Sequence, residues 1–169
     1  MSQETFDSMA HVEREHWWFR AKRERALQQL GARPIGRGVA VDVGCGTGEL
    51  ASVLRGLRQH NVIGLDLSEH ALTHANRRLG GEFASGFQLL RAEAEHLPLR
   101  TDSASMLVSM DVIEHLDDDR AALREYRRVV EPRGMVVVAV PAYQWAWSGH
   151  DEALGHRRRY TAKRLHGVV

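Results

Sequence analysis

The sequence is poor in cysteine, in long apolar runs and in net charge, and each shortage excludes a class of protein. One cysteine, Cys45, occurs among 169 residues, so no disulfide can form within the chain, which fits a reducing compartment. No run of about 18 apolar residues is present, so no membrane-spanning helix is expected. The polar, acidic residues 1–10 are not typical of a secretory signal. We therefore expect a cytoplasmic protein.

The charges of the two signs nearly cancel. Lys and Arg number 23 and Asp and Glu number 22, which gives a formal net charge of +1. A general nucleic-acid-binding protein is usually strongly basic, so a nucleic-acid partner is not favoured. The chain also has no internal repeat and no break in composition, and we expect residues 1–169 to form one domain.

Short aliphatic segments alternate with helical patterns along most of the chain. The strands are predicted at residues 39–43, 61–67, 87–92, 105–110 and 135–140. Asp7 and Ser8 are candidate caps for a first helix ending near Gly31, Ser68 caps a later helix, and Pro132 ends the helix after the fourth strand. Aliphatic strands alternating with helices predict a mostly parallel sheet covered on both faces, which is a doubly wound, Rossmann-like α/β fold.

A glycine-rich segment, VDVGCGTGEL at residues 41–50, joins the first predicted strand to the next helix. Gly44, Gly46 and Gly48 allow a ligand to approach the backbone, and the helix N-terminus offers free N–H groups to an anion. The spacing G-x-G-x-G differs from the G-x-G-x-x-G of dinucleotide enzymes. Asp42 lies just before the loop and favours a cationic ligand, such as an ammonium or a sulfonium. The alternative is a tight turn without a ligand.

A second acid, Asp66, ends the second predicted strand, where nucleoside sites bind ribose hydroxyls. Together with the motifs A-E-A-E-H-L-P (92–98) and D-V-I-E-H-L (111–116), these residues resemble the class I S-adenosylmethionine-dependent methyltransferases. The resemblance covers residues 39–140. It implies that the glycine loop binds the methionine part of the cofactor, that Asp66 binds the ribose and that Glu93 borders the adenine. Glu93, at a position more often Asp, is equally well explained as a solvated loop acid.

The resemblance implies ten cofactor-binding residues in all, and they are spread over four loops. They are Asp42, Gly44, Cys45, Gly46, Gly48, Asp66, Leu67, Glu93, Ala94 and Met110. It also implies about five strands in the order 3-2-1-4-5, with residues 1–33 as a helical lid, 34–140 as the cofactor-binding core and 141–169 as an acceptor-side loop and short helix.

One feature departs from the family. Class I methyltransferases normally add a C-terminal antiparallel hairpin after the fifth strand, and here it is missing because only 29 residues follow Val140. The chain therefore looks shortened, whether as a fragment or naturally. An open fifth strand invites pairing, so we expect a homodimer or a partner that covers this edge.

Methyl transfer requires an aligned nucleophile, and a hydroxyl or protonated amine acceptor also requires a base. Histidine is the side chain whose pKa suits this role, and the candidates are His115, His150 and His156. For each of them the alternative is a surface or helix-capping histidine. Their spacing in the sequence does not decide between the two readings.

Three residues, Asp111, Glu114 and His115, could share one face of a helix and hold a divalent metal. The pattern resembles the E-x-x-E-H of metal-assisted quinone and small-RNA methyltransferases, with a shorter Asp in the first position. The alternative, which we rank first, is a helix start at which Asp117, Asp118 and Asp119 add further acids. No metal is therefore expected.

Aromatic residues gather at the two ends of the chain, where eight of the 11 lie: Phe6, Trp17, Trp18, Phe19, Tyr143, Trp145, Trp147 and Tyr160. They predict either an apolar lid over an acceptor pocket or packing of the first helix onto the domain. The nearby segment HDEALGHRRRY (150–160) predicts either an acceptor-side loop, with Arg157–Arg159 docking an anion, or a self-paired surface loop.

Three functions remain open at this point. The first is methyl transfer from S-adenosylmethionine to a small-molecule acceptor. The second is a cofactor-binding but inactive fragment or interaction module. The third, which we rank last because the charge is balanced, is a metal-assisted RNA or quinone methyltransferase. Binding of S-adenosylhomocysteine is common to all three and absent from a dinucleotide enzyme.

Overall fold

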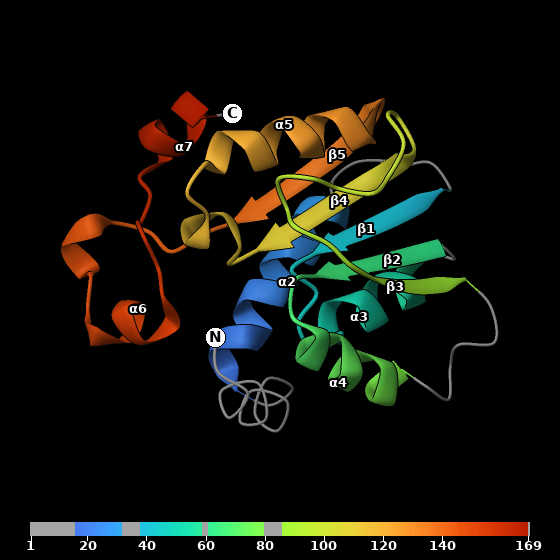
Figure 1. Ribbon diagram of the computed structural model, residues 1–169, viewed down its shortest axis with the longest axis horizontal. Helices are drawn as coiled ribbons and strands as arrows, with labels where there is room; N and C mark the ends of the chain where they lie inside the picture. Colours follow the sequence, from blue (N-terminus) through green and yellow to red (C-terminus); the bar gives the residue numbers. More distant parts are fainter. Residues whose placement is uncertain (1–15, 32–37, 59–60, 80–85, 169) are drawn as a thin grey trace.

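A five-stranded parallel sheet forms the centre of the computed structural model, which describes residues 16–31, 38–58, 61–79 and 86–168 (Figure 1). The strands are β1 (Val39–Val43), β2 (Asn61–Asp66), β3 (Phe87–Arg91), β4 (Ala104–Met110) and β5 (Val130–Ala139). They pair in the order β3-β2-β1-β4-β5, and all four pairings are parallel. This confirms the predicted doubly wound fold and its strand order.

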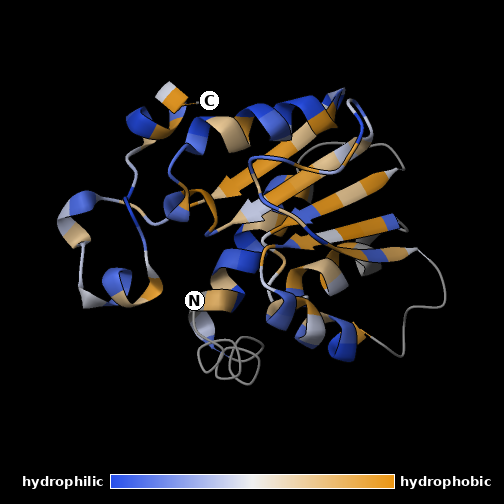
Figure 2. Ribbon diagram, viewed as in Figure 1, coloured by the Kyte–Doolittle hydropathy of each residue, from blue (hydrophilic) through white to orange (hydrophobic). Residues whose placement is uncertain are grey.

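Helices cover both faces of the sheet. The described helices are α2 (Trp17–Gly31), α3 (Glu49–Arg58), α4 (Glu69–Leu79), α5 (Asp119–Val129), α6 (Gly149–Leu154) and α7 (Ala162–Val168), of which α6 lies beyond the strand ends and not on a face of the sheet (Figure 1). Leu30 of α2 and Leu54 of α3 pack with Ala40, Val62 and Val108 on one face of the sheet. The strand residues in between, such as Val41 and Leu107, point to the other face of the sheet, where they pack against α5. The side chains of successive strand residues alternate between these two cores, as a doubly covered sheet requires. The ribbon of the central strands is accordingly mostly hydrophobic (Figure 2).

The predicted ends of the elements are mostly confirmed. α2 ends at Gly31, and the Ser68 hydroxyl accepts a hydrogen bond from the N–H of Ala71 at 3.2 Å, as a helix cap does. The predicted caps Asp7 and Ser8 lie outside the described residues.

The largest difference concerns the start of the fifth strand. α5 ends before Pro132, as predicted, but β5 begins immediately afterwards at Val130, five residues earlier than expected. The pairing register with β4 shifts between Ala104 and Met106, and this irregularity accommodates Pro132 and Gly134 within the strand. Proline and glycine therefore mark a bulge here and not a loop.

The C-terminal segment folds back onto the domain. It passes through the 3-10 helix η2 (Gln144–Ala146) and α6 and returns so that Tyr160 pairs with Ala142 and α7 lies beside α5 (Figure 1). Tyr160 is 2% exposed, and its hydroxyl donates to Asp119 Oδ2 at 2.8 Å. Residues 141–168 are thus fixed to the carboxyl edge of the sheet by a buried anchor.

The outer edge of β5 carries no further strand within the part of the chain that the structure describes. In the same described residues, no helix has the length and apolar character needed to span a bilayer.

Candidate active site

The glycine loop lies directly after β1, at the carboxyl edge of the sheet. Gly44, Gly46 and Gly48 have φ angles of +72°, +52° and +84°, which other residues rarely adopt. A Cβ on Gly44 would lie 2.3 Å from Val112 Cγ2, whereas a Cβ on Gly46 would meet nothing within 4 Å. Gly44 is therefore needed for packing inside the domain. Gly46 exposes its backbone to open space, where a ligand can approach.

Asp66 connects the end of β2 to this loop. Its Oδ2 accepts from the N–H of Gly46 at 2.9 Å, and its Oδ1 accepts from the N–H of Ser68 at 2.8 Å. The N–H of Leu67 is a further donor to this carboxylate, so at least one of its about four acceptor positions remains for a hydroxyl of a ligand. Burial raises the pKa of Asp66, and the hydrogen bonds from Ser68 and Gly46 oppose this effect. The structure thus brings the two predicted cofactor motifs into direct contact.

The remaining predicted residues of this loop are buried. Asp42 is 2% and Cys45 6% exposed. Burial raises the pKa of the Cys45 thiol, and the carboxylates of Asp42 and Asp66 raise it further. Cys45 is therefore a neutral thiol that packs inside the domain, and it is not a nucleophile.

A shallow hollow of about 480 Å³ lies beside the ends of β2 and β3. Its lining comprises Leu67, Glu93, Glu95, His96, Asp118 and Ala121. Leu67 is 57% exposed, and the carboxylate of Glu93 lies 3.4 Å from His96 Nδ1. The predicted residues Leu67 and Glu93 therefore lie at one surface, where a flat heterocycle could rest. Ala94 is turned into the core, and Met110 ends β4 half-buried.

Asp111 does not join Glu114 and His115 on a helix face. Its φ angle is +55°, and the chain becomes helical only at Ile113, in the 3-10 helix η1 (Ile113–His115). The Asp111 carboxylate instead accepts from the Lys22 ammonium of α2. Burial lowers the pKa of Lys22 to about 8, although the carboxylate of Glu114 acts in the opposite direction. A backbone turn that the residue pattern does not encode thus removes Asp111 from the predicted set.

Helix α2 is fastened to the carboxyl edge by a second ion pair. Arg23 of α2 lies 3.4 Å from Glu49, the first residue of α3, and Arg78 of α4 lies 2.8 Å from the same carboxylate. Lys22 and Arg23 therefore connect α2, the described part of the predicted N-terminal lid, to loops at the carboxyl edge, while Leu30 of the same helix packs on one face of the sheet. Sequence reasoning did not single out either residue, because no local pattern distinguishes a helix lysine that reaches a loop 89 positions away.

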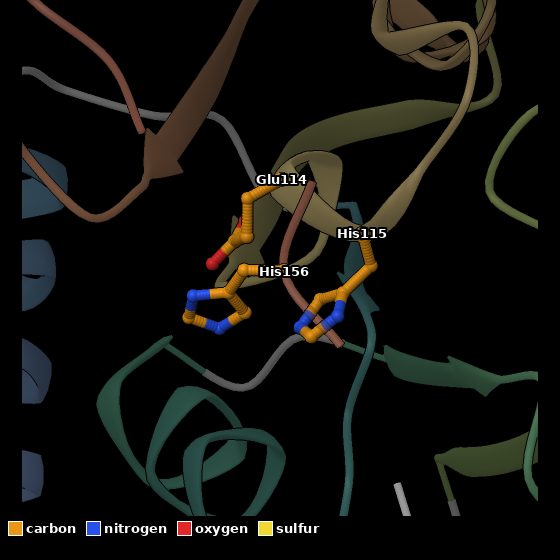
Figure 3. Close-up of side chains that lie close together, drawn as sticks. All are labelled: Glu114, His115 and His156. Atoms are coloured by element: carbon orange, nitrogen blue, oxygen red, sulfur yellow. The ribbon is translucent and has the colours of Figure 1, made fainter. Parts of the chain in front are cut away.

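Two of the three predicted histidines meet at one place, together with Glu114 (Figure 3). The rings of His115 and His156 lie 4.8 Å apart, edge to face. Glu114 is fully buried, and burial raises its pKa to about 7. Burial and, to a smaller extent, the neighbouring His156 lower the pKa of His115. His150 is exposed on α6 and lies outside this cluster.

His156 is held in place by a buried carboxylate. Its Nδ1–H donates to Asp151 Oδ1 at 2.8 Å, and Asp151 is itself fully buried. Asp151 also accepts two hydrogen bonds of 2.8 Å from Arg159 and one of 2.9 Å from the N–H of Ser148. These donors, with Arg159 first, hold the pKa of Asp151 well below its usual range. The only sequence signal of this role is the capping box Ser148-x-x-Asp151.

The arginines of the segment 150–160 are already paired within the protein. Arg157 Nε donates to the carbonyl of His115 at 2.8 Å, and Arg158 Nη2 donates to that of Leu116 at 2.7 Å. Arg158 also lies 3.2 Å from Asp119. Arg157 and Arg158 therefore connect the returning chain to η1 and the residues just after it, whereas Arg159 pairs with Asp151 within the segment. These contacts support the self-paired reading over a docking site for an anion.

Among the aromatic side chains that the structure describes at the two ends of the chain, three are largely exposed and do not close over a pocket. Trp17, Tyr143 and Trp145 are 69%, 52% and 83% exposed. Tyr143 and Trp145 stack on each other with ring centroids 5.8 Å apart. Tyr160, by contrast, belongs to the hydrophobic core.

A sheet in the order 3-2-1-4-5, with a glycine loop after its first strand and an acid after its second, defines the class I methyltransferase architecture. The family model described as "Methyltransferase domain" matches residues 41–138. The chain therefore belongs to the S-adenosylmethionine-dependent methyltransferase family.

Known proteins agree with this assignment. A protein of Mycolicibacterium smegmatis named as a probable S-adenosylmethionine-dependent methyltransferase is 32% identical over 153 residues, which cover 89% of this chain and 56% of the relative. The malonyl-[acyl-carrier protein] O-methyltransferase of Yersinia pestis is 32% identical over 139 residues, covering 82% of this chain and 47% of the relative. The chain thus spans about half the length of these curated relatives.

The fold also matches a solved structure. The phosphoethanolamine N-methyltransferase 2 of Haemonchus contortus in complex with S-adenosyl-L-methionine superposes with a TM-score of 0.76 at 18% identity, covering 88% of this chain and 35% of that chain. At this identity the likeness concerns the fold alone.

Proposed function

We propose that this chain transfers a methyl group from S-adenosylmethionine to a small-molecule acceptor at the carboxyl edge of its sheet. The observation that carries the proposal is the hydrogen bond between Asp66 Oδ2 and the N–H of Gly46. It places the acid of β2 beside the one glycine of the loop whose missing side chain leaves open space.

The residues around this contact fit the parts of that cofactor. S-adenosylmethionine, when bound, supplies a methyl group that is bonded to a sulfonium sulfur. The neutral thioether that departs when this methyl group is transferred is a good leaving group. The proposed roles are that Gly46 admits the methionine part, that Asp66 accepts from the ribose hydroxyls, and that Leu67 and Glu93 border the adenine. The buried Asp42 adds negative charge beneath a cationic ligand.

The proposed acceptor side is the cluster of Glu114, His115 and His156. The lowered pKa of His115 keeps its imidazole neutral near pH 7, so that it can accept a proton or donate a lone pair. Asp151 orients His156 in the same way that a buried carboxylate orients a catalytic imidazole. One relative named above is a malonyl-[acyl-carrier protein] O-methyltransferase, so it transfers the methyl group to an oxygen. We propose an oxygen of a small molecule as the acceptor.

Transfer of labelled methyl groups tests this proposal. The protein is incubated with methyl-labelled S-adenosylmethionine and a panel of phenols, carboxylates and amines, and extracted products are counted. We expect transfer to at least one oxygen acceptor, abolished by His156→Ala and unchanged in the exposed control His150→Ala. Cofactor binding without turnover on any acceptor would contradict the proposal of methyl transfer. It would favour the alternative of a cofactor-binding but inactive module.

The open edge of β5 leads to a proposal about assembly. Because unpaired strand edges pair readily, we propose that a second copy of this chain or a partner covers β5. Sedimentation analysis of the purified chain is expected to show a dimer or a complex, and a stable monomer at all concentrations would contradict the proposal. The cytoplasm is the proposed location, because the single cysteine is a buried thiol.

A further inference from the structure

We propose that Glu114, His115 and His156 together bind one divalent transition-metal ion, of the kind typified by Zn²⁺ and Co²⁺. Two imidazoles and one carboxylate are a ligand set that such ions use when they keep coordination positions open for water or a substrate. The three residues come from two separate segments, η1 and the loop after α6, and the fold brings them together (Figure 3).

The buried carboxylate of Glu114 is the first argument. Both of its oxygens are buried, and neither has a hydrogen-bond partner among the described residues. A buried carboxylate without hydrogen bonds is expensive unless it takes up a proton or a cation compensates it. Lys22 attracts this carboxylate electrostatically, but its ammonium is hydrogen-bonded to Asp111. A metal ion between Glu114 and the two imidazoles would supply the coordination that the carboxylate lacks.

The orientation of His156 is the second argument. Asp151 accepts from Nδ1 of this imidazole, so Nδ1 carries the proton and Nε2 keeps its lone pair. Metal-binding histidines commonly donate their second N–H to a carboxylate in this manner, which fixes the ring and makes it a better ligand. Arg159 and the N–H of Ser148 immobilise Asp151 in turn. Arg159 also balances the negative charge of Asp151. Asp151 therefore orients the metal ligand His156 and does not itself bind the metal.

The spacing of the three side chains is the third argument. One ligand atom from each residue lies within 4.8 Å of the other two. A point equidistant from three atoms at that separation is about 2.8 Å from each (4.8/√3), and metal bonds of about 2.1 Å then require shifts below about 1 Å. The half-buried ring of His115 can make such a shift by rotating about its side-chain bonds.

This inference concerns the acceptor side of the proposed function, which it deepens, but it is tested without methyl transfer. The full chain is freed of metal with EDTA, dialysed and titrated with Co²⁺ while the visible ligand-field absorption is recorded. We expect one ion per chain, with displacement by Zn²⁺ and not by Mg²⁺, because imidazole ligands favour the former.

Variants assign the ion to the cluster. His156→Ala and Glu114→Gln are each expected to weaken Co²⁺ binding at least tenfold, and His150→Ala, on exposed α6, is the matched control. If His156→Ala or Glu114→Gln does not unfold cooperatively, Co²⁺ binding is measured in His115→Ala instead, because His115 is only half-buried. Weaker binding in this variant then assigns the ion to the cluster. No spectral change on adding Co²⁺ to the folded wild type would overturn the metal site, as would equal affinity in His115→Ala. Transfer of labelled methyl groups by the same metal-free protein would then show that the proposed function survives without the metal site.

Discussion

Gly46 and Asp66 are 20 residues apart in the chain, and a hydrogen bond of 2.9 Å joins the N–H of the first to the carboxylate of the second. The N–H groups of Gly44 and Cys45 both bind the carbonyl of Leu65 at 2.7 and 3.0 Å, which fixes the same loop to the end of β2. The ends of β1 and β2 thus form one rigid surface at the carboxyl edge. The predictions below start from this surface.

Replacing Asp66 by Ala should weaken cofactor binding. The substitution leaves the ribose hydroxyls without a hydrogen-bond acceptor and removes the acceptor of the Gly46 N–H. We therefore expect a loss of about 1–3 kcal/mol in the free energy of binding. Titration calorimetry with S-adenosylhomocysteine measures the loss. Glu69→Ala, which removes an exposed acid three residues away, is the matched control and should bind like wild type. Unchanged affinity in Asp66→Ala would show that Asp66 has been wrongly assigned.

Two glycines of the loop should respond differently to substitution by alanine. Gly44→Ala brings a methyl group to 2.3 Å from Val112 Cγ2 and should lower the free energy of unfolding by about 1–3 kcal/mol or more. Gly46→Ala has room in the free protein, so it should cost only about 1–2 kcal/mol for its left-handed backbone.

The ligand distinguishes these two variants further. Because the methyl group of Gly46→Ala occupies the space through which a ligand approaches, this variant should lose most of its affinity for S-adenosylhomocysteine while remaining folded. Urea unfolding and calorimetry on the same samples separate the two effects. Wild-type affinity in Gly46→Ala would mean that the open space at Gly46 is not the cofactor site.

The fold and the contact of the glycine loop with Asp66 could be predicted from the sequence because their signals are local. Glycines between a strand and a helix, and an acid at the end of the next strand, predict the fold and the edge of the sheet at which a ligand is expected. The contact between Gly46 and Asp66 follows once the strands are parallel and adjacent. The start of β5 was missed because Pro132 and Gly134, usually breakers, lie here in a bulge.

The stability of the protein should depend on the protonation of Glu114. Burial raises its pKa from 4.5 to about 7, so the folded state holds this proton more tightly than the unfolded state. Its contribution to stability is therefore fully present below about pH 4.5 and is lost as the pH rises through about 7. The pKa difference, 7 minus 4.5, corresponds to about 3 kcal/mol of unfolding free energy.

The variant Glu114→Gln isolates this effect. The difference in unfolding free energy between wild type and Glu114→Gln is measured in urea with EDTA present, from pH 4.5 to pH 8. It should shift by about 3 kcal/mol in favour of the variant as the pH rises. A difference that stays constant over this range would mean that the carboxyl titrates at its ordinary pKa.

The pair of the buried Asp151 and the partly buried Arg159 should stabilise the C-terminal segment. Asp151→Asn leaves the guanidinium of Arg159 without its charged partner, and we expect a loss of about 1–3 kcal/mol in the free energy of unfolding. Arg124→Ala breaks the exposed pair with Asp118 at 3.4 Å, which water screens, and should cost much less. Equal losses in the two variants, measured by urea unfolding, would contradict the role of Asp151 as an anchor.

The acceptor half of the site could be predicted only in part. His115 and His156 were singled out by residue type, but His150 was singled out on the same ground and lies outside the cluster. Their convergence depends on the return of residues 148–160 over η1, through hydrogen bonds such as that from the N–H of Arg157 to the carbonyl of Glu114 at 2.9 Å. Such pairings across 40 or more positions have no periodic signature in a single sequence.

Calorimetric titration of the wild-type chain with S-adenosylhomocysteine tests the central claim most directly, because it measures the cofactor site without any assumption about the acceptor. We predict saturable binding at one site per chain, which Asp66→Ala weakens and Glu69→Ala leaves unchanged. No heat of binding at high micromolar ligand, from protein that unfolds cooperatively, would contradict the account.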